Sequence, residues 1–134
     1  MGTWEELDHT ADLAVRVCAS SLEDLFSTSA DAMFSLVAEP EGAECTNRED
    51  FTLEAIDRET LLIDWLNELL YIHERHRVVI TEFVFERLTD TELQARVRGL
   101  PVKEYYINIK AATFHNLEIE TDGEEFRTTI VFDV

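Results

Sequence analysis

The sequence predicts an α+β fold, a two-layer sandwich in which two helices pack on a mostly antiparallel sheet. Two segments carry apolar residues at helical spacing, and several others carry them at every second position. Predicted strands and helices alternate only in the first half of the chain, and the second half is predicted to form successive strands. With 134 residues, 46% of them apolar, the chain suits one domain, 1–134, with a substantial core.

The first strand and the first helix are predicted near the start of the chain. Alternating apolar residues indicate a strand near 12–18, with a weaker candidate at 4–7. Ser20 and Glu23 have the spacing of a capping box, which predicts the start of a helix. The apolar face of this helix consists of Leu22, Leu25, Phe26, Met33, Leu36 and Val37. Pro40 and Gly42 are expected to end it.

A polar loop at 41–50, a strand near 50–56 and a second helix from about Arg58 to His73 come next. The apolar stripe of this helix is Leu61, Leu62, Trp65, Leu66, Leu69 and Leu70. Its other face carries Asp64, Asn67 and Glu68 at spacings of three and four residues. Such a face is usually solvated, but in a cleft it would suit acid–base work or support of a metal site.

The second half of the chain predicts strands. Residues 78–88 and 93–97 read as two strands joined by a turn at 89–91. The segment Gly99-Leu100-Pro101 is expected to break the second strand, and 102–111 is less regular.

Three signals follow towards the end of the chain. Leu117 and Ile119 begin another alternation, and Asp122-Gly123 is typical of a tight hairpin turn. The last predicted strand begins at Phe126 and runs to the end of the chain.

The charge bears on partners and surroundings. With 29 acidic and 11 basic residues the formal net charge is −18, so we expect no direct nucleic-acid binding and no membrane association. Only Lys103 and Lys110 are lysines, and abundant acid with little lysine suits a salt-rich cytoplasm. A halophilic source is a hypothesis that predicts poor folding in low salt.

Localisation and the state of the thiols can also be predicted. No targeting segment or long apolar run is visible, so we expect a soluble cytoplasmic protein. Cys18 and Cys45 lack metal-knuckle spacing, which favours buried thiols in a reducing compartment.

Carboxylates at two places in the chain could bind a hard cation. Asp8-His9-Thr10-Ala11-Asp12 lies at the mouth of the first strand, where a turn is the ordinary alternative. Asp133 and the terminal carboxylate of Val134 end the last strand, where a frayed acidic end is the alternative.

Two further residues stand out in the segment 109–115. Lys110, rare in this chain, could contact a phosphate or neutralise a carboxylate cluster, although a single solvated lysine is the simpler interpretation. His115 shares strand parity with Leu117, so a core histidine and a functional one are both open. The chain has no GxSxG, P-loop, GxGxxG or HExxH motif, which favours a metal-bearing accessory protein over a nucleotide enzyme.

Taken together, these segments resemble the archease family. They are His9-Thr10-Ala11-Asp12, Ser21-Leu22-Glu23-Asp24-Leu25-Phe26, Leu61 to Leu70, Ile109-Lys110-Ala111-Ala112-Thr113-Phe114-His115 and Val131-Phe132-Asp133-Val134. The resemblance implies an accessory protein of the RtcB-type RNA ligase in tRNA splicing, which promotes GTP-dependent guanylylation and multiple turnover. Residues 100–108 are shorter than in many members, which affects only how this stretch would meet the partner.

The resemblance also assigns roles to residues. Asp12 and Asp133 would be the metal-binding carboxylates, the Val134 terminal oxygens would complete the shell, and Lys110 would be the functional lysine. His9, Asp64 and His115 belong to the same motifs, and Asp64 fits a helix-surface residue equally well. Oxygen ligands indicate calcium, with magnesium or manganese as alternatives.

Two other classes of function remain open at this point. A stand-alone metal-dependent phosphoester hydrolase could use the same carboxylates without a partner. A general chaperone-like modulator would bind several client proteins, and this binding would not depend on Asp12 or Asp133.

Overall fold

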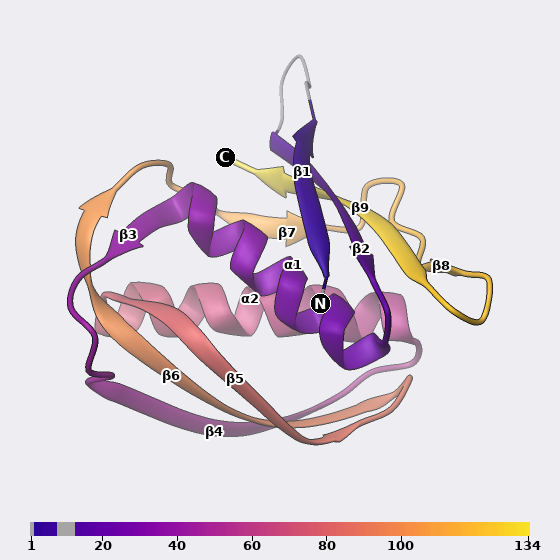
Figure 1. The fold of residues 1–134 in the computed structure, drawn as a ribbon, viewed down its shortest axis with the longest axis horizontal. Helices are drawn as coiled ribbons and strands as arrows, with labels where there is room; N and C mark the ends of the chain where they lie inside the picture. Colours follow the sequence, from indigo (N-terminus) through magenta and orange to yellow (C-terminus); the bar gives the residue numbers. More distant parts are fainter. Residues whose placement is uncertain (1, 8–12) are drawn as a thin grey trace.

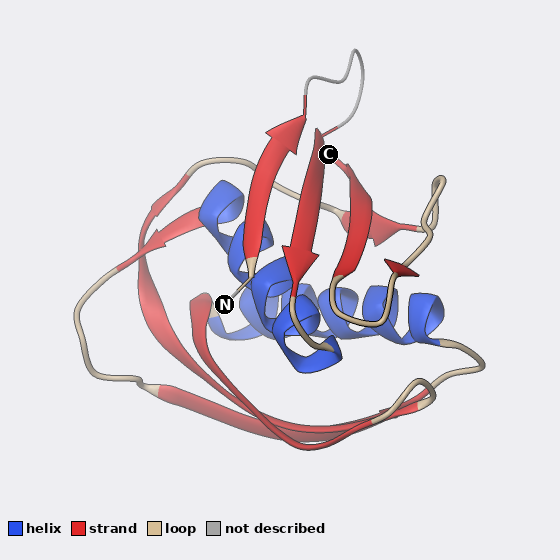
Figure 2. Cartoon of the chain, turned by 45° about the vertical axis from the view of Figure 1, so that its right-hand side comes forward, coloured by secondary structure: helices blue, strands red, loops and turns tan. Residues whose placement is uncertain are grey.

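The computed structural model describes residues 2–7 and 13–134, and in this part of the chain two helices lie between two sheets (Figures 1 and 2). The helices are α1 (Leu22–Val37) and α2 (Arg58–His76). The strands are β1 (Thr3–Leu7), β2 (Leu13–Ala19), β3 (Ala38–Pro40), β4 (Asn47–Glu54), β5 (Val78–Leu88), β6 (Glu92–Tyr105), β7 (Ala111–Thr113), β8 (Glu120–Thr121) and β9 (Phe126–Asp133).

Every strand pair in the described ranges is antiparallel. One sheet has the order β1-β2-β9-β7, with β8 on β9, and the other has the order β3-β6-β4, with β5 on β6. The predicted α+β class, with two helices on antiparallel strands, is confirmed. The division into two sheets was not predicted, because alternation shows which side chains share a face but not which strands pair.

The helix boundaries follow local capping. Ser21, not Ser20, caps α1, and its Oγ accepts a hydrogen bond from the Asp24 amide at 3.0 Å. Asp57 caps α2 by accepting from the Thr60 amide at 2.8 Å. At the other end of α2, Arg77 adopts the left-handed conformation with φ 54° and ends the helix.

Trp65 on α2 lies at the centre of the core. The indole is fully buried, and its N–H donates to the Phe26 carbonyl of α1 at 3.0 Å. On the other side its ring packs against Phe83 and Phe85 of β5, with centroids 5.8 and 5.0 Å away. Because α2 has a sheet on either side, its buried residues extend around more of the helix than the predicted stripe.

The expected break of the strand at residues 99–101 is wrong, because β6 continues through it to Tyr105. Gly99 permits close packing, since a Cβ there would lie 2.9 Å from the Cβ of Val78. Pro101 supplies its carbonyl, which accepts from the Glu41 amide at 2.8 Å. A proline that contributes only an acceptor can therefore remain within this strand.

Other boundaries differ more modestly from the prediction. Helix α1 already ends at Val37, and β4 begins at Asn47 within the predicted loop. Near the C-terminus, the alternation at Leu117 and Ile119 yields only the two-residue strand β8. The Asp122-Gly123 hairpin is confirmed, with Gly123 at φ 95° and β8 paired to β9.

Both thiols are free but only partly buried, so the prediction of buried cysteines is wrong. Cys45 lies in the loop before β4, and its Sγ donates to Glu82 at 2.9 Å, which the sequence spacing does not reveal. In the described parts of the chain, neither helix is long and apolar enough to cross a membrane.

Candidate functional site

Lys110 and Asp133 are brought together by the pairing of β7 with the end of β9. Ala111 lies opposite Asp133 in the register, and the Lys110 amide donates to the Asp133 carbonyl at 2.7 Å. Figure 1 shows β7 alongside β9 close to the C-terminus. Two residues separated by more than twenty positions are therefore backbone neighbours, which sequence spacing alone does not establish.

The segment around Lys110 is anchored on both sides of the lysine. Ile109 and Ala112 are buried, whereas Lys110 between them is exposed. Thr113 adds a bond from its Oγ1 to the Val131 carbonyl of β9 at 2.8 Å. The backbone here is held firmly, while the ammonium of Lys110 has no ion pair with any described residue.

Asn67 of α2 fixes this segment, and it is a residue whose role the sequence did not reveal. Its Oδ1 accepts from the Ala112 amide at 2.8 Å, and its Nδ2 donates to the Ala112 carbonyl at 3.3 Å. The helical spacing grouped Asn67 with the polar face of α2, but nothing in that spacing identifies Ala112 as its partner. Asn67 thus positions the strand that follows Lys110.

The carboxylate of Asp133 lies at the exposed end of β9, followed by Val134. Oxygen donors of this kind suit hard cations such as calcium or magnesium. However, within the described ranges no three His, Cys, Asp or Glu side chains form a group that could hold a metal ion. Asp12 and His9, the other predicted members, lie outside the described residues.

Asp64 lies one helical turn before Asn67 and is half-buried. Burial raises the pKa of its carboxyl above the usual aspartate range. Among the described residues, no hydrogen bond or ion pair joins it to Lys110 or Asp133. Asp64 therefore makes no direct polar contact with either residue in the described ranges.

His115 is exposed, so a core role for this histidine is excluded. Its amide donates to Thr113 Oγ1 at 3.3 Å, and the next residue, Asn116, is left-handed with φ 52°. The chain turns here instead of continuing as a strand, and the parity shared with Leu117 therefore does not place His115 in the core.

Comparison with known proteins decides the family. A model of the Archease protein family (MTH1598/TM1083) matches residues 4–134. The chain is 31% identical to "Protein archease" of Methanosarcina mazei, over 98% of this chain and 95% of that protein. This chain belongs to the archease family.

Solved structures agree with the archease assignment. The solution structure of Methanobacterium thermoautotrophicum protein 1598 is 31% identical, covers 98% of each chain and superposes with a TM-score of 0.75. The crystal structure of a Thermotoga maritima archease, described as a "possible chaperone", gives a TM-score of 0.71 at 23% identity, over 97% of this chain and 96% of that one. At that identity it supports the archease fold alone.

Proposed function

We propose that this archease is a non-catalytic cytoplasmic accessory protein of an RtcB-type RNA ligase. It would promote GTP-dependent guanylylation of the ligase and its multiple turnover in tRNA splicing. The observation that carries the proposal, together with family membership, is the juxtaposition of Lys110 and Asp133 on a rigid sheet end. Rigid presentation of exposed charges is what an activator needs at another protein's active site.

Lys110 would act on phosphate charge. Its ammonium has no carboxylate partner in the described ranges, so it is available to an anionic group of the ligase complex. The bonds of Asn67 and Thr113 hold the backbone around it, which limits the conformational entropy lost when it meets that group. A fixed positive charge stabilises developing negative charge in phosphoryl and nucleotidyl transfer.

Asp133 would contribute to a divalent metal site. The remaining ligands would be Asp12 and the main-chain oxygens of Val134, with His9 nearby in sequence. A calcium ion fits these hard oxygen donors best, and magnesium or manganese is the alternative. Such an ion would supply positive charge beside the phosphates, and the carboxylates would set its position.

The surface near these residues fits a protein partner. Phe114 and Val134 are 56% and 45% exposed and would offer apolar surface to a partner beside the proposed functional charges. A chain with a net charge of −18 is also complementary to a basic, RNA-binding enzyme rather than to RNA itself.

The test is a guanylylation assay of the matching ligase with GTP, with and without this protein. We expect stimulation by the native chain and loss of stimulation for the folded variants Asp12→Ala and Asp133→Ala. Asp90→Ala, which removes an exposed aspartate from a turn of the other sheet, is the matched control and should stimulate normally. Full stimulation by both folded aspartate variants would refute the assignment.

The same preparation distinguishes the other classes. A phosphoester hydrolase would turn over substrate with metal and no ligase present. A general chaperone-like modulator would bind unrelated proteins regardless of Asp12 and Asp133. Either result would contradict the ligase-specific proposal.

A further inference from the structure

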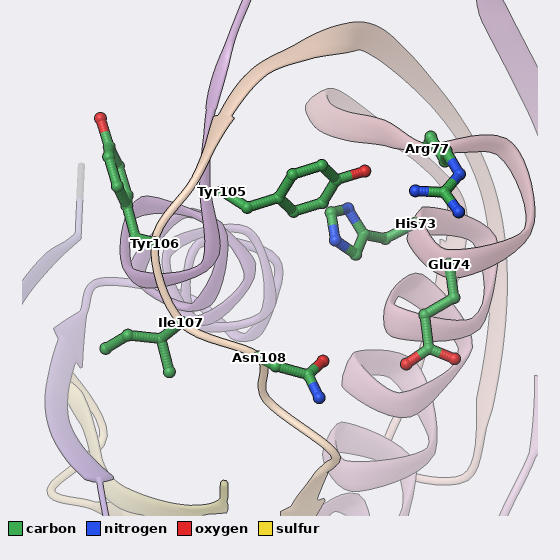
Figure 3. A pocket seen from close by; sticks show the side chains of 7 residues that line it. All are labelled: His73, Glu74, Arg77, Tyr105, Tyr106, Ile107 and Asn108. Carbon is green, nitrogen blue, oxygen red and sulfur yellow. The ribbon is translucent and has the colours of Figure 1, made fainter.

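A cavity of about 550 Å³ lies between the C-terminal end of α2 and the segment that leaves β6. His73, Glu74 and Arg77 line it from the helix, and Tyr105, Tyr106 and Asn108 line it from the other side (Figure 3). None of these residues belongs to the proposed ligase-activating site. The cavity is large enough for a molecule of amino-acid size and combines charged, polar and aromatic walls.

His73 presents a hydrogen-bond acceptor to this cavity. The side chain is only 7% exposed, and its Nδ1 lies 2.7 Å from the Val78 carbonyl. Because a carbonyl only accepts, Nδ1 carries the proton, and in the neutral form of the ring Nε2 is then an acceptor. Nε2 has no hydrogen bond to any described residue, and in Figure 3 the free edge of the ring points towards the space beside Asn108.

Glu74 and Arg77 place opposite charges on this cavity without neutralising each other. Residues three positions apart on a helix usually can pair. Here Arg77 has left the helix in the left-handed conformation, φ 54° and ψ 53°, and no ion pair joins it to Glu74 or to another described residue. In Figure 3 the two charged groups lie on either side of His73.

The aromatic walls come from consecutive residues. Tyr105 packs edge-on against His73, with centroids 5.7 Å apart, and is 51% exposed. Tyr106 is also about half exposed, and its pKa is raised by partial burial and then by the carboxylates of Glu39 and Glu104. Acidic groups near this wall disfavour a multiply charged anion as the occupant.

We propose that this cavity is a binding site for a small zwitterion of the α-amino acid class. Its carboxylate would bind the Arg77 guanidinium, and its ammonium would donate to Glu74 and to Nε2 of His73. An apolar or aromatic side chain would pack on Tyr105 and Tyr106. The two charges of one ligand would thus bind Arg77 and Glu74, which form no ion pair with each other.

The test is binding of free L-amino acids to the full chain, followed by ¹H–¹⁵N correlation spectra. L-phenylalanine and L-leucine at millimolar concentration are the first probes, each beside its N-acetyl and its carboxamide derivative. We expect saturable shifts confined to residues 73–77 and 105–108 with at least one free amino acid. Both derivatives, each lacking one charge, should bind about tenfold more weakly or not at all.

Arg77→Gly is the decisive variant, since glycine accepts the left-handed conformation and the helix end should stay intact. It should weaken binding by about tenfold or more. Arg98→Gln removes another exposed arginine, one on β6 without an ion pair to a described residue, and should leave binding unchanged. Absence of saturable shifts across all twenty amino acids would overturn the proposal, as would equal binding of the derivatives or of Arg77→Gly. No ligase is present in this experiment, so its outcome is independent of the proposed ligase activation.

Discussion

The Lys110–Asp133 end of the sheet and the cavity beside α2 organise charge in opposite ways. At the sheet end the backbone is pinned by strand pairing and by Asn67, while the charged side chains extend into solvent. At the cavity the backbone leaves the helix at Arg77, whose left-handed conformation separates this cation from the helical run that carries Glu74. The first region is recognisable from motifs, whereas the second depends on a backbone conformation that no motif records.

Both regions contain a cation without a carboxylate partner among the described residues, in a chain of net charge −18. Most other basic groups are paired, as Arg96 is with Asp50 and Glu86 at 3.3 and 3.2 Å. Exposed ion pairs contribute little stability, so their presence elsewhere shows mainly that partners are easily found on this surface. A cation that lacks one is therefore a candidate for contact with another molecule.

The largest expected effect separates the two regions by function. Lys110→Ala should reduce stimulation of ligase guanylylation about tenfold or more, because a fixed positive charge near the phosphates is lost. The same variant should bind amino acids at the cavity normally, since Lys110 does not line it. Parallel guanylylation assays and correlation spectra on one preparation measure both.

Lys103→Ala provides the matched control for Lys110. Lys103 is also exposed and lies 3.8 Å from Glu39 in a weak surface pair. Its replacement should leave guanylylation at the native level. If both lysine variants lowered stimulation equally, a loss of overall positive charge would explain the result. The proposed specific role of Lys110 would then be refuted.

The next effect concerns Asn67 of α2, whose side chain bonds to the backbone of Ala112 and so supports the Lys110–Asp133 end of the sheet. Asn67→Ala leaves the amide and carbonyl of the buried Ala112 without these partners, so the free energy of unfolding should fall by about 1–3 kcal/mol. In this variant, hydrogen exchange of the Ala112 backbone amide should accelerate more than hydrogen exchange of the Trp65 backbone amide. Urea denaturation and hydrogen exchange measure the two quantities.

Glu68→Ala is the control for Asn67, because the neighbouring side chain makes no hydrogen bond to a described residue. It should change stability by about 0.5 kcal/mol or less. Equal destabilisation by the two variants would show that helix α2, not its bond to Ala112, is the sensitive element.

A smaller effect is expected at Arg77, which controls the second region. Glycine relieves the steric cost of the left-handed conformation but loses more backbone entropy on folding. Arg77→Gly should therefore be between unchanged and about 1 kcal/mol more stable than the native chain, and Arg77→Ala less stable than Arg77→Gly. If the alanine variant were the more stable of the two in urea denaturation, the left-handed turn would not determine this helix end.

The same contrast explains how much the sequence could predict. The apolar period predicted α2 and the Asp-Gly pair predicted the Asp122-Gly123 hairpin, because both signals depend on neighbouring residues. The pairing of Ala111 with Asp133 and the bond from Asn67 to Ala112 depend on the tertiary arrangement, so no local pattern contains them. His115 was ambiguous for the same reason, since parity with Leu117 assumes a strand that turns at Asn116 instead.

The smallest expected effect decides whether Asp64 belongs to the first region or only to the surface of α2. Burial raises the pKa of Asp64 in the folded chain, so the folded state holds the proton more tightly than the unfolded state. The cost of ionising Asp64 is therefore present above its folded pKa and disappears as the pH falls below the unfolded value. Asp64→Asn should raise stability at pH 7 by about 0.5 kcal/mol or less. By about pH 3, below the usual aspartate range, the difference should have vanished.

Asp31 on α1 is the matched case, because burial also raises its pKa and it lies in neither region. Denaturation curves of Asp31→Asn and Asp64→Asn at several pH values should therefore run in parallel, and both variants should stimulate the ligase. A loss of stability or of stimulation confined to Asp64→Asn would mean that its ionised carboxylate has a favourable partner. Asp64 would then join Lys110 and Asp133 as a functional residue, because solvation alone would not distinguish it from Asp31.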